Sequence, residues 1–189
     1  GTLHALDETC QKYGTDYVGY TGYSGRDIVY YKPEKFDYKQ LTFLKERSAA
    51  LGEVWEPIDD LTKIPFQGFA SIKCFGTAAV CKDISKVMES KLSLHAPVIR
   101  DPFNMDHYVV QATVEGCTKG EVLKRFALAQ GCEGPIVAAG DDFNDVSMLK
   151  VANIRIVMAT APREVLEMAD IIAAPASEGG LAAALYRLL

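Results

Sequence analysis

The sequence predicts an α/β protein that consists of a partial parallel-sheet core and an inserted α+β domain. Residues 109–189 read as a regular alternation of strands and helices, which implies a parallel sheet with right-handed crossovers. Residues 20–108 are richer in Tyr, Phe, Lys and turn residues. We therefore expect residues 1–19 and 109–189 to form the partial core, and residues 20–108 to form the inserted domain.

The core begins with a strand that ends at 111–114 and continues into a capped helix. Thr118 is expected to cap this helix, and Glu121 three residues later completes a capping-box pattern. Gly131 is a plausible stop. The apolar stripe of the helix has the expected spacing and consists of Val122, Leu123, Phe126, Ala127 and Gln130.

The next strand is predicted from a short apolar run. Pro135–Ala139 ends at Gly140 and is typical of a strand that is buried on both faces. Pro162 stands where it can open a later helix. The remaining expected elements of the core are a helix over 146–151, a strand over 154–159, a helix from 162 to 169, a strand over 170–174 and a helix over 180–189.

The inserted domain is expected to contain both kinds of element. An N-terminal helix over 3–13 is assigned to the core. The expected strands of the inserted domain lie at 27–31, 69–74, 98–100 and 107–110, and its expected helices at 38–51 and 78–92.

Composition excludes several functional classes. The net charge of −5 argues against a nucleic-acid binder that relies on a basic face. The five cysteines form no C-x-x-C pair, which argues against a zinc site or a disulfide framework and favours reduced thiols in a cytoplasmic protein. No run approaches the ~18 apolar residues of a membrane helix, so no membrane partner is expected.

The strongest chemical signal is the acidic loop at residues 140–145, with the sequence Gly-Asp-Asp-Phe-Asn-Asp. The loop follows a predicted buried strand, at the sheet edge where α/β proteins bind ligands. Three carboxylates this close together repel unless a cation neutralises them, and oxygen ligands suit Mg²⁺. An acidic turn that caps the next helix is the structural alternative. An EF-hand loop fits poorly, because no Gly stands at its sixth position and no Glu at its twelfth.

Lys119 favours a site that binds metal and phosphate over an acidic turn that only caps the next helix. It occupies the first position of a predicted helix, where the helix dipole disfavours a cation. A phosphate bound there would be attracted both by the helix N-terminus and by the lysine. A solvated lysine that covers apolar surface is the alternative.

These motifs together resemble the haloacid dehalogenase superfamily, and in particular its Cof-type phosphatases with a class II α/β cap. The resemblance spans about 113–189. It rests on Thr118–Glu121, the loop 140–145, Met148–Lys150, Val157–Pro162 with Ala169-Asp170, and Ser177–Gly180. The resemblance implies a Rossmann-like core, a magnesium-dependent phosphatase and a small phosphorylated metabolite, such as a sugar phosphate, as substrate. The segment 20–108 matches only in layout.

The resemblance also implies a role for each site residue. Asp141 would ligate Mg²⁺ directly, and Asp145 would support the metal through water. Asn144 would orient the phosphate or the nucleophile. Lys119 would hold the attacking aspartate and the transferring phosphoryl group together, a role that is consistent with catalysis by positioning and charge neutralisation. Asp142 has no firm role in the pattern.

Two departures from the family pattern are visible. The family reaction uses an Asp nucleophile in a D-x-D motif, and the sequence contains no D-x-D. We expect the chain to begin after at least one strand–helix–strand unit, which is about 30 or more residues. Truncation and a divergent, non-catalytic protein both explain the missing motif. In addition, Ala159-Thr160-Ala161 stands where the family commonly has Gly-Asn-Ala.

Several functions therefore remain open from the sequence. A non-catalytic fragment that binds metal, phosphate or a partner is the main alternative to a phosphatase, and a phosphomutase of the same superfamily is a variant. A receiver domain is disfavoured, because there the acidic pair precedes the lysine. Aromatic residues that could line a pocket, although a core role is favoured for them, are Tyr20, Tyr23, Trp55, Phe66, Phe69 and His107.

Overall fold

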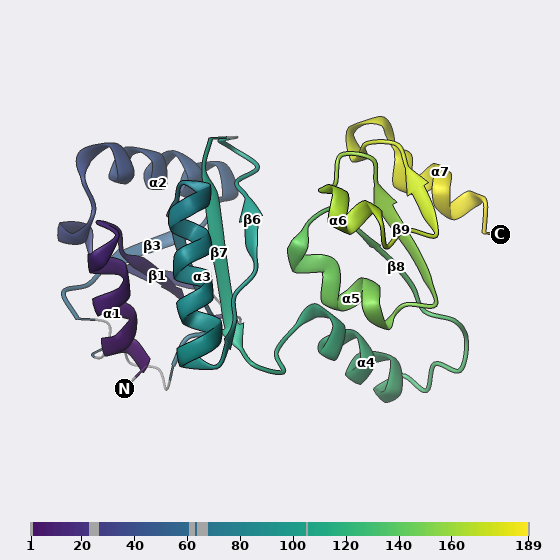
Figure 1. Cartoon of the computed structure of the whole chain (residues 1–189), viewed down its shortest axis with the longest axis horizontal. Helices are drawn as coiled ribbons and strands as arrows, with labels where there is room; N and C mark the ends of the chain where they lie inside the picture. Colours follow the sequence, from purple (N-terminus) through teal and green to yellow (C-terminus); the bar gives the residue numbers. More distant parts are fainter. Residues whose placement is uncertain (1, 23–26, 61–62, 64–67, 105, 189) are drawn as a thin grey trace. The chain divides into compact units, whose positions relative to one another are not determined.

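The computed structural model describes residues 2–22, 27–60, 63, 68–104 and 106–188. The chain forms two compact units, Gly1–Glu115 and Gly116–Leu189, here called the first and the second unit. Tyr23 and Phe66, two of the aromatic residues named above, lie outside the described residues. Figure 1 shows the elements of both units.

The first unit is built on a mixed sheet of seven strands in the order β3-β2-β1-β4-β7-β5, with β6 also paired to β7. Strands β2 and β3 pair in parallel, and the other pairs are antiparallel. Its elements are α1 (Thr2–Lys12), β1 (Tyr17–Tyr20), β2 (Ile28–Tyr31), η1 (Pro33–Lys35), α2 (Tyr38–Leu51), β3 (Val54–Pro57), β4 (Ser71–Gly76), α3 (Ala78–Leu92), β5 (Leu94–His95), β6 (Val98–Arg100) and β7 (Tyr108–Val114).

Helices cover both faces of this sheet. The buried residues of α1 and α3, such as Leu6 and Ile84, pack with Cys74 and Val110 on one face, where Figure 1 shows the two helices side by side. On the other face, Leu44 of α2 packs with residues of β1, β2, β4 and β7. The sheet therefore lies between two hydrophobic layers, as in an α+β domain.

Local signals in the sequence explain where the two long helices of this unit begin and end. Helix α2 has a complete capping box between Asp37 and Gln40, and it ends at Gly52, which has a φ of 64° in the left-handed region. Helix α3 begins at Thr77, whose side chain accepts a hydrogen bond from the Val80 N–H. The bounds of both helices agree with the sequence prediction.

The unit boundary differs from the division expected from the sequence. Residues 1–19, which include helix α1 and most of β1, were expected in the parallel-sheet core, and residues 109–114 were expected there as well. In the structure, Leu6 and Cys10 of α1 are buried against the first unit, and β1 pairs with β2 and β4. Strand β7 is a single strand that pairs with β4. Burial and strand pairing thus place all these residues in the first unit.

The second unit has a parallel sheet of three strands in the order β10-β9-β8. This confirms the predicted α/β fold class with a parallel sheet. Its elements are α4 (Lys119–Ala129), β8 (Val137–Gly140), η3 (Phe143–Asp145), α5 (Val146–Val151), β9 (Ile154–Met158), α6 (Arg163–Leu166), β10 (Ile171–Ala173), η4 (Ala176–Glu178) and α7 (Gly180–Tyr186).

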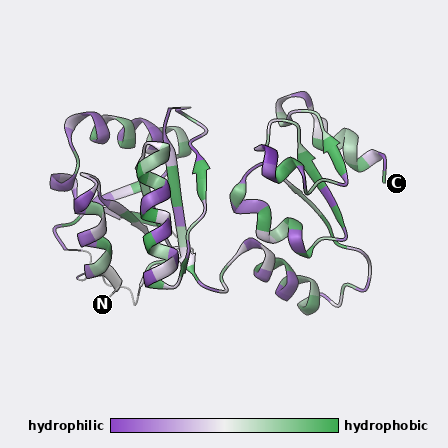
Figure 2. Cartoon of the chain, viewed as in Figure 1, coloured by the Kyte–Doolittle hydropathy of each residue, from purple (hydrophilic) through white to green (hydrophobic). Residues whose placement is uncertain are grey.

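Hydrophobic residues run along β9, whereas helices such as α3 and α4 carry both hydrophobic and hydrophilic residues (Figure 2). Ile156 and Val157 of β9 are fully buried, and they contribute to two clusters on opposite faces of the sheet. A central parallel strand that is apolar on both faces fits this arrangement.

Two expectations about burial in the second unit were wrong. Val122 and Phe126 of the predicted stripe on α4 are 58% and 62% exposed. Strand β8 alternates between exposed and buried residues, and Val137 is 39% exposed. Strand β8 lies at one edge of the sheet that the three described strands form.

Among the described residues, no helix is long and apolar enough to cross a membrane.

Candidate active site

The acidic loop lies directly after the carboxyl end of β8, as the sequence predicted. Asp142 precedes the short helix η3, and its side chain accepts a hydrogen bond from the Phe143 N–H at 2.7 Å. Asp145 closes η3 and is buried. The loop therefore presents a buried carboxylate beside the sheet edge where α/β proteins bind their ligands.

Gly140 is required by a close approach. A Cβ atom on Gly140 would lie only 2.5 Å from the Cβ of Asp145. The role of Gly140 in the structure is to make room for the Asp145 side chain. This contact fixes Asp145 against the end of β8.

Both oxygens of Asp145 are engaged. Oδ1 accepts a hydrogen bond from Lys119 Nζ at 2.5 Å, and Oδ2 accepts one from the Asp141 N–H at 3.0 Å. The structure thus brings Lys119 and Asp145 together across 26 positions of sequence, and it connects both to Asp141. Lys119 is about half exposed and Asp145 is buried, so one partner of this ion pair is accessible to solvent and the other is not.

The electrostatics of Asp141 reflect crowding with its neighbour. The residue lies at the surface of the loop, but its carboxyl group is partly screened from water. This partial burial raises the pKa of Asp141, and the nearby Asp145 raises it further, while Lys119 opposes the shift. A cation bound beside Asp141 would relieve the same repulsion.

The N-terminus of α4 is less available than the sequence suggested. The Thr118 side chain accepts from the Glu121 N–H at 3.2 Å, and the Ser147 hydroxyl accepts from the Gly120 N–H at 3.1 Å. Two amides that could have held a phosphate are therefore already bonded. The Lys119 ammonium, at the same terminus, carries a positive charge that can attract an anion.

The donor set fits Mg²⁺ rather than a metal that needs a protein cage. Among the described residues, no group of three or more His, Cys, Asp and Glu side chains is arranged to hold a metal. Mg²⁺ commonly takes one or two protein carboxylates and completes its octahedron with water and phosphate oxygens. Asp141 and Asp145, with the amide of Asn144 between them in η3, supply such a partial set.

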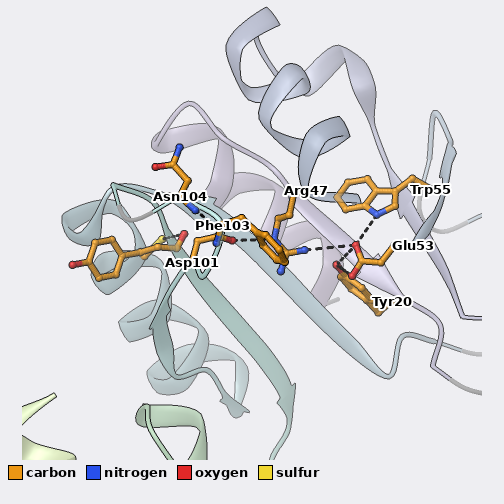
Figure 3. A network of polar contacts seen from close by, with 9 residues as sticks. Tyr20, Arg47, Glu53, Trp55, Asp101, Phe103 and Asn104 are labelled. Atoms are coloured by element: carbon orange, nitrogen blue, oxygen red, sulfur yellow. Dashed lines mark hydrogen bonds and ion pairs between the residues drawn. The ribbon is translucent and has the colours of Figure 1, made fainter. Parts of the chain in front are cut away.

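The aromatic residues of the first unit belong partly to a polar network. Tyr20 Oη donates to Glu53 Oε1 at 3.1 Å, and Trp55 Nε1 donates to Glu53 Oε2 at 2.9 Å (Figure 3). Arg47 lies between Glu53 and Asp101 in the same view, with an Nε to Oδ2 distance of 2.9 Å to Asp101. Tyr20 and Trp55 are therefore held by hydrogen bonds inside the unit.

The sequence analysis missed Arg47 and Asp101. The Arg47 side chain is 7% exposed and that of Asp101 is 0% exposed. Asp101 Oδ1 also accepts the N–H groups of Phe103 and Asn104. An arginine in an amphipathic helix is normally solvated, so no local pattern marks this residue as buried.

His107 lines a cavity in the first unit. Its ring stacks on Phe43 with centroids 4.4 Å apart. The two residues border a cavity of about 530 Å³ whose walls also include Phe36 and Phe75. Phe69 does not line it and instead packs over Gly19, where a Cβ atom would meet its ring.

Comparisons with known proteins agree with this fold. The chain is 26% identical over 148 residues to a candidate phosphatase of Haemophilus influenzae, a match that covers 77% of this chain and 53% of that protein. It is also similar in structure to a subclass IIB sugar phosphatase of the haloacid dehalogenase superfamily, with a TM-score of 0.73 and 19% identity, covering 99% of this chain and 65% of the other.

A haloacid dehalogenase-like hydrolase from Bacteroides thetaiotaomicron gives a TM-score of 0.68 at 19% identity, with 100% of this chain and 66% of that one covered. The chain thus spans about half the length of the curated relative, 53%, and about two thirds of these two solved structures. The family model for haloacid dehalogenase-like hydrolases matches residues 2–185. The predicted family is confirmed: the chain belongs to the haloacid dehalogenase-like hydrolases.

Proposed function

We propose that this protein is a magnesium-dependent phosphoric monoester hydrolase. The observation that carries the proposal is the connected set of Lys119, Asp145 and Asp141 at the carboxyl end of β8. A cation and two carboxylates meet there at the edge of a parallel sheet. Membership of a hydrolase family and similarity to a candidate phosphatase support the same activity.

Each residue has a role in this proposal. Asp141, the more exposed carboxylate, would hold Mg²⁺ directly, and Asp145 would support it through water because both of its oxygens are already engaged. Bound Mg²⁺ would neutralise charge on the phosphoryl oxygens. Asn144 would orient the phosphate by hydrogen bonding. Lys119 would attract the phosphate and keep it near the carboxylates, which is catalysis by positioning and by charge stabilisation.

The family reaction uses an attacking aspartate in a D-x-D motif. The sequence contains no D-x-D motif. Strand β8 has one strand neighbour among the described strands, and Val122 and Phe126 of α4 are exposed. We propose that the nucleophilic aspartate comes from polypeptide that pairs along the other edge of β8. A parallel strand at that edge would end beside the acidic loop, because the carboxyl ends of parallel strands share one edge of the sheet.

The proposed substrate is a small phosphorylated metabolite such as a sugar phosphate. The sugar phosphatase similar in structure acts on this class, and the present site has a single described lysine paired to its carboxylates. A single ammonium suits one phosphate group rather than a polyanion.

The test is hydrolysis of p-nitrophenyl phosphate with and without Mg²⁺. It uses the 189-residue chain and the protein expressed from its whole reading frame. We expect turnover in the whole-frame protein, its loss on removal of Mg²⁺ and in Asp141→Ala, and no change in Asp83→Ala, which alters an exposed carboxylate on α3. Turnover by the 189-residue chain that Asp141→Ala abolishes would contradict the proposed external nucleophile. An inactive whole-frame protein would contradict the phosphatase proposal itself.

A further inference from the structure

Helices α4 and α5 approach each other unusually closely beside the proposed site. Gly120, at the second position of α4, is buried, and a Cβ atom there would lie 2.2 Å from the Ser147 carbonyl oxygen and 2.6 Å from its carbonyl carbon. These atoms belong to the backbone of α5, so they cannot rotate away as the end of a side chain could. Only glycine at 120 permits this contact.

A hydrogen bond holds the same contact together. The Ser147 hydroxyl accepts the Gly120 N–H at 3.1 Å. Amides in the first turn of a helix have no partner within the helix, so Ser147 from the neighbouring helix takes the place of a capping group. The Gly120–Ser147 contact, defined by this bond and by the backbone approach, therefore joins the N-terminus of α4 to α5.

The site residues lie immediately beside this contact. Lys119 precedes Gly120, and Asp145 comes two positions before Ser147. The Lys119 Nζ to Asp145 Oδ1 distance is 2.5 Å. Asp145 is fixed from the other side by Gly140. The position of the lysine relative to the carboxylate is consequently set by how closely α4 approaches α5.

We infer that Gly120 and Ser147 are positioning residues for the proposed phosphoryl-transfer site, because their contact places the Lys119 ammonium on Asp145. The inference rests on the proposed function. In this inference both residues act through Lys119. A methyl group at 120 would force the helices about 1 Å apart, and a displacement of about 1 Å in a reacting group can lower catalysis on the order of 100-fold.

The experiment first measures the geometry without using turnover. Lysines are acetylated with a water-soluble acetylating reagent at low conversion, and the rate at Lys119 is compared with those at Lys124 and Lys150 by mass spectrometry. We expect Gly120→Ala and Ser147→Ala to raise the relative rate at Lys119 severalfold, because an amine released from its carboxylate is freer to react. Ser147→Thr keeps the hydroxyl and should restore the wild-type rate.

Gly134→Ala is the matched control, because a Cβ atom at Gly134 would meet nothing within 4 Å. Circular dichroism establishes that each variant is folded, and Ser147→Ala keeps the question answerable if Gly120→Ala does not fold. An unchanged Lys119 rate in the folded alanine variants would overturn the inference.

Kinetics of the whole-frame protein then separate this inference from the proposed function. We expect Gly120→Ala to lower kcat about 100-fold with a smaller change in KM, because the phosphate is still bound but Lys119 is misplaced. A folded Gly120→Ala protein with wild-type kcat would overturn the positioning role even if Lys119 labelling changed. Absence of turnover in the unmodified protein would refute the proposed function, whereas the labelling result would still decide whether the contact positions Lys119.

Discussion

The two units of this protein use charged residues in opposite ways. In the first unit, Arg47 and Asp101 are buried together, and their charges satisfy each other and nearby backbone amides. In the second unit, Lys119 is about half exposed and Asp141 lies at the surface, so the charges remain within reach of a ligand.

This difference shows that the exposure of a charged group determines whether it can bind a ligand. A charged group that is buried in an ion pair is screened from a substrate, and it contributes mainly to the specificity of one packed arrangement. A charged group that is paired on one side and open on the other can exchange its partner for a ligand. Substitutions in the first unit should therefore change stability, and substitutions in the second unit should change activity.

The largest expected effect is on the stability of the first unit. Asp101→Ala removes the carboxylate that Arg47 Nε contacts at 2.9 Å, leaves Arg47 with the more distant Glu53 carboxylate at 3.6 Å, and removes the acceptor of two backbone amides. We expect the free energy of unfolding to fall by about 3–5 kcal/mol. Urea denaturation followed by the fluorescence of Trp55, the single tryptophan, measures this, because Trp55 lies in the same network. Asp83→Ala is the control, and an equal effect of both substitutions would break the comparison.

The next effect is on activity. Lys119→Met in the whole-frame protein removes the ammonium that contacts Asp145 but keeps the length of the side chain. We expect kcat/KM for p-nitrophenyl phosphate to fall on the order of 100- to 1,000-fold. The urea midpoint reported by Trp55 should not move. Lys124→Met, on the same helix, is the control, and comparable losses in both variants would show that the effect is not specific to the site.

A smaller effect on stability is expected for Tyr20, which contacts the buried network through its hydroxyl. Tyr20→Phe removes one hydroxyl that donates to Glu53, while Trp55 still donates to the same carboxylate. We expect a loss of about 1.5 kcal/mol in the free energy of unfolding. Tyr38→Phe should have no effect because Tyr38 is 84% exposed. A loss as large as that of Asp101→Ala would mean that the hydroxyl, not the ion pair, is central to the network.

The smallest effect concerns an exposed ion pair of the second unit. Arg155 donates two side-chain hydrogen bonds to Asp170, and they lower the pKa of Asp170 to about 2. The ordinary pKa of an aspartate is about 3.9, so the pair stabilises the fold fully above about pH 4 and loses this contribution as the pH falls towards 2. The difference in thermal midpoint between wild type and Asp170→Asn should accordingly shrink as the pH is lowered over that range. A difference that does not vary with pH would refute the coupling.

Much of the local structure could be predicted because its signals are local. Helices α2 and α3 begin at capping residues and end at residues in the left-handed region, and their bounds agree with the prediction. The parallel pairing of β8, β9 and β10 was also predicted from the alternation of strands and helices. The prediction failed for α4, because an apolar stripe shows which face could be buried but not whether another element covers it.

The sequence by itself predicted the main helices, the parallel strands of the second unit and the family, because capping residues, periodicity and motif spacing are properties of neighbouring positions. It did not predict β3 and β5. Lys119, Asp141, Asn144 and Asp145 remain its predicted site. The tertiary structure alone decided which charges are paired. Arg47 meets Asp101 across 54 positions, and Gly120 meets Ser147 across 27. Such contacts depend on sheet order and on how closely two backbones approach, and no local pattern records either. For the same reason, only the structure could assign α1 and β1 to the first unit.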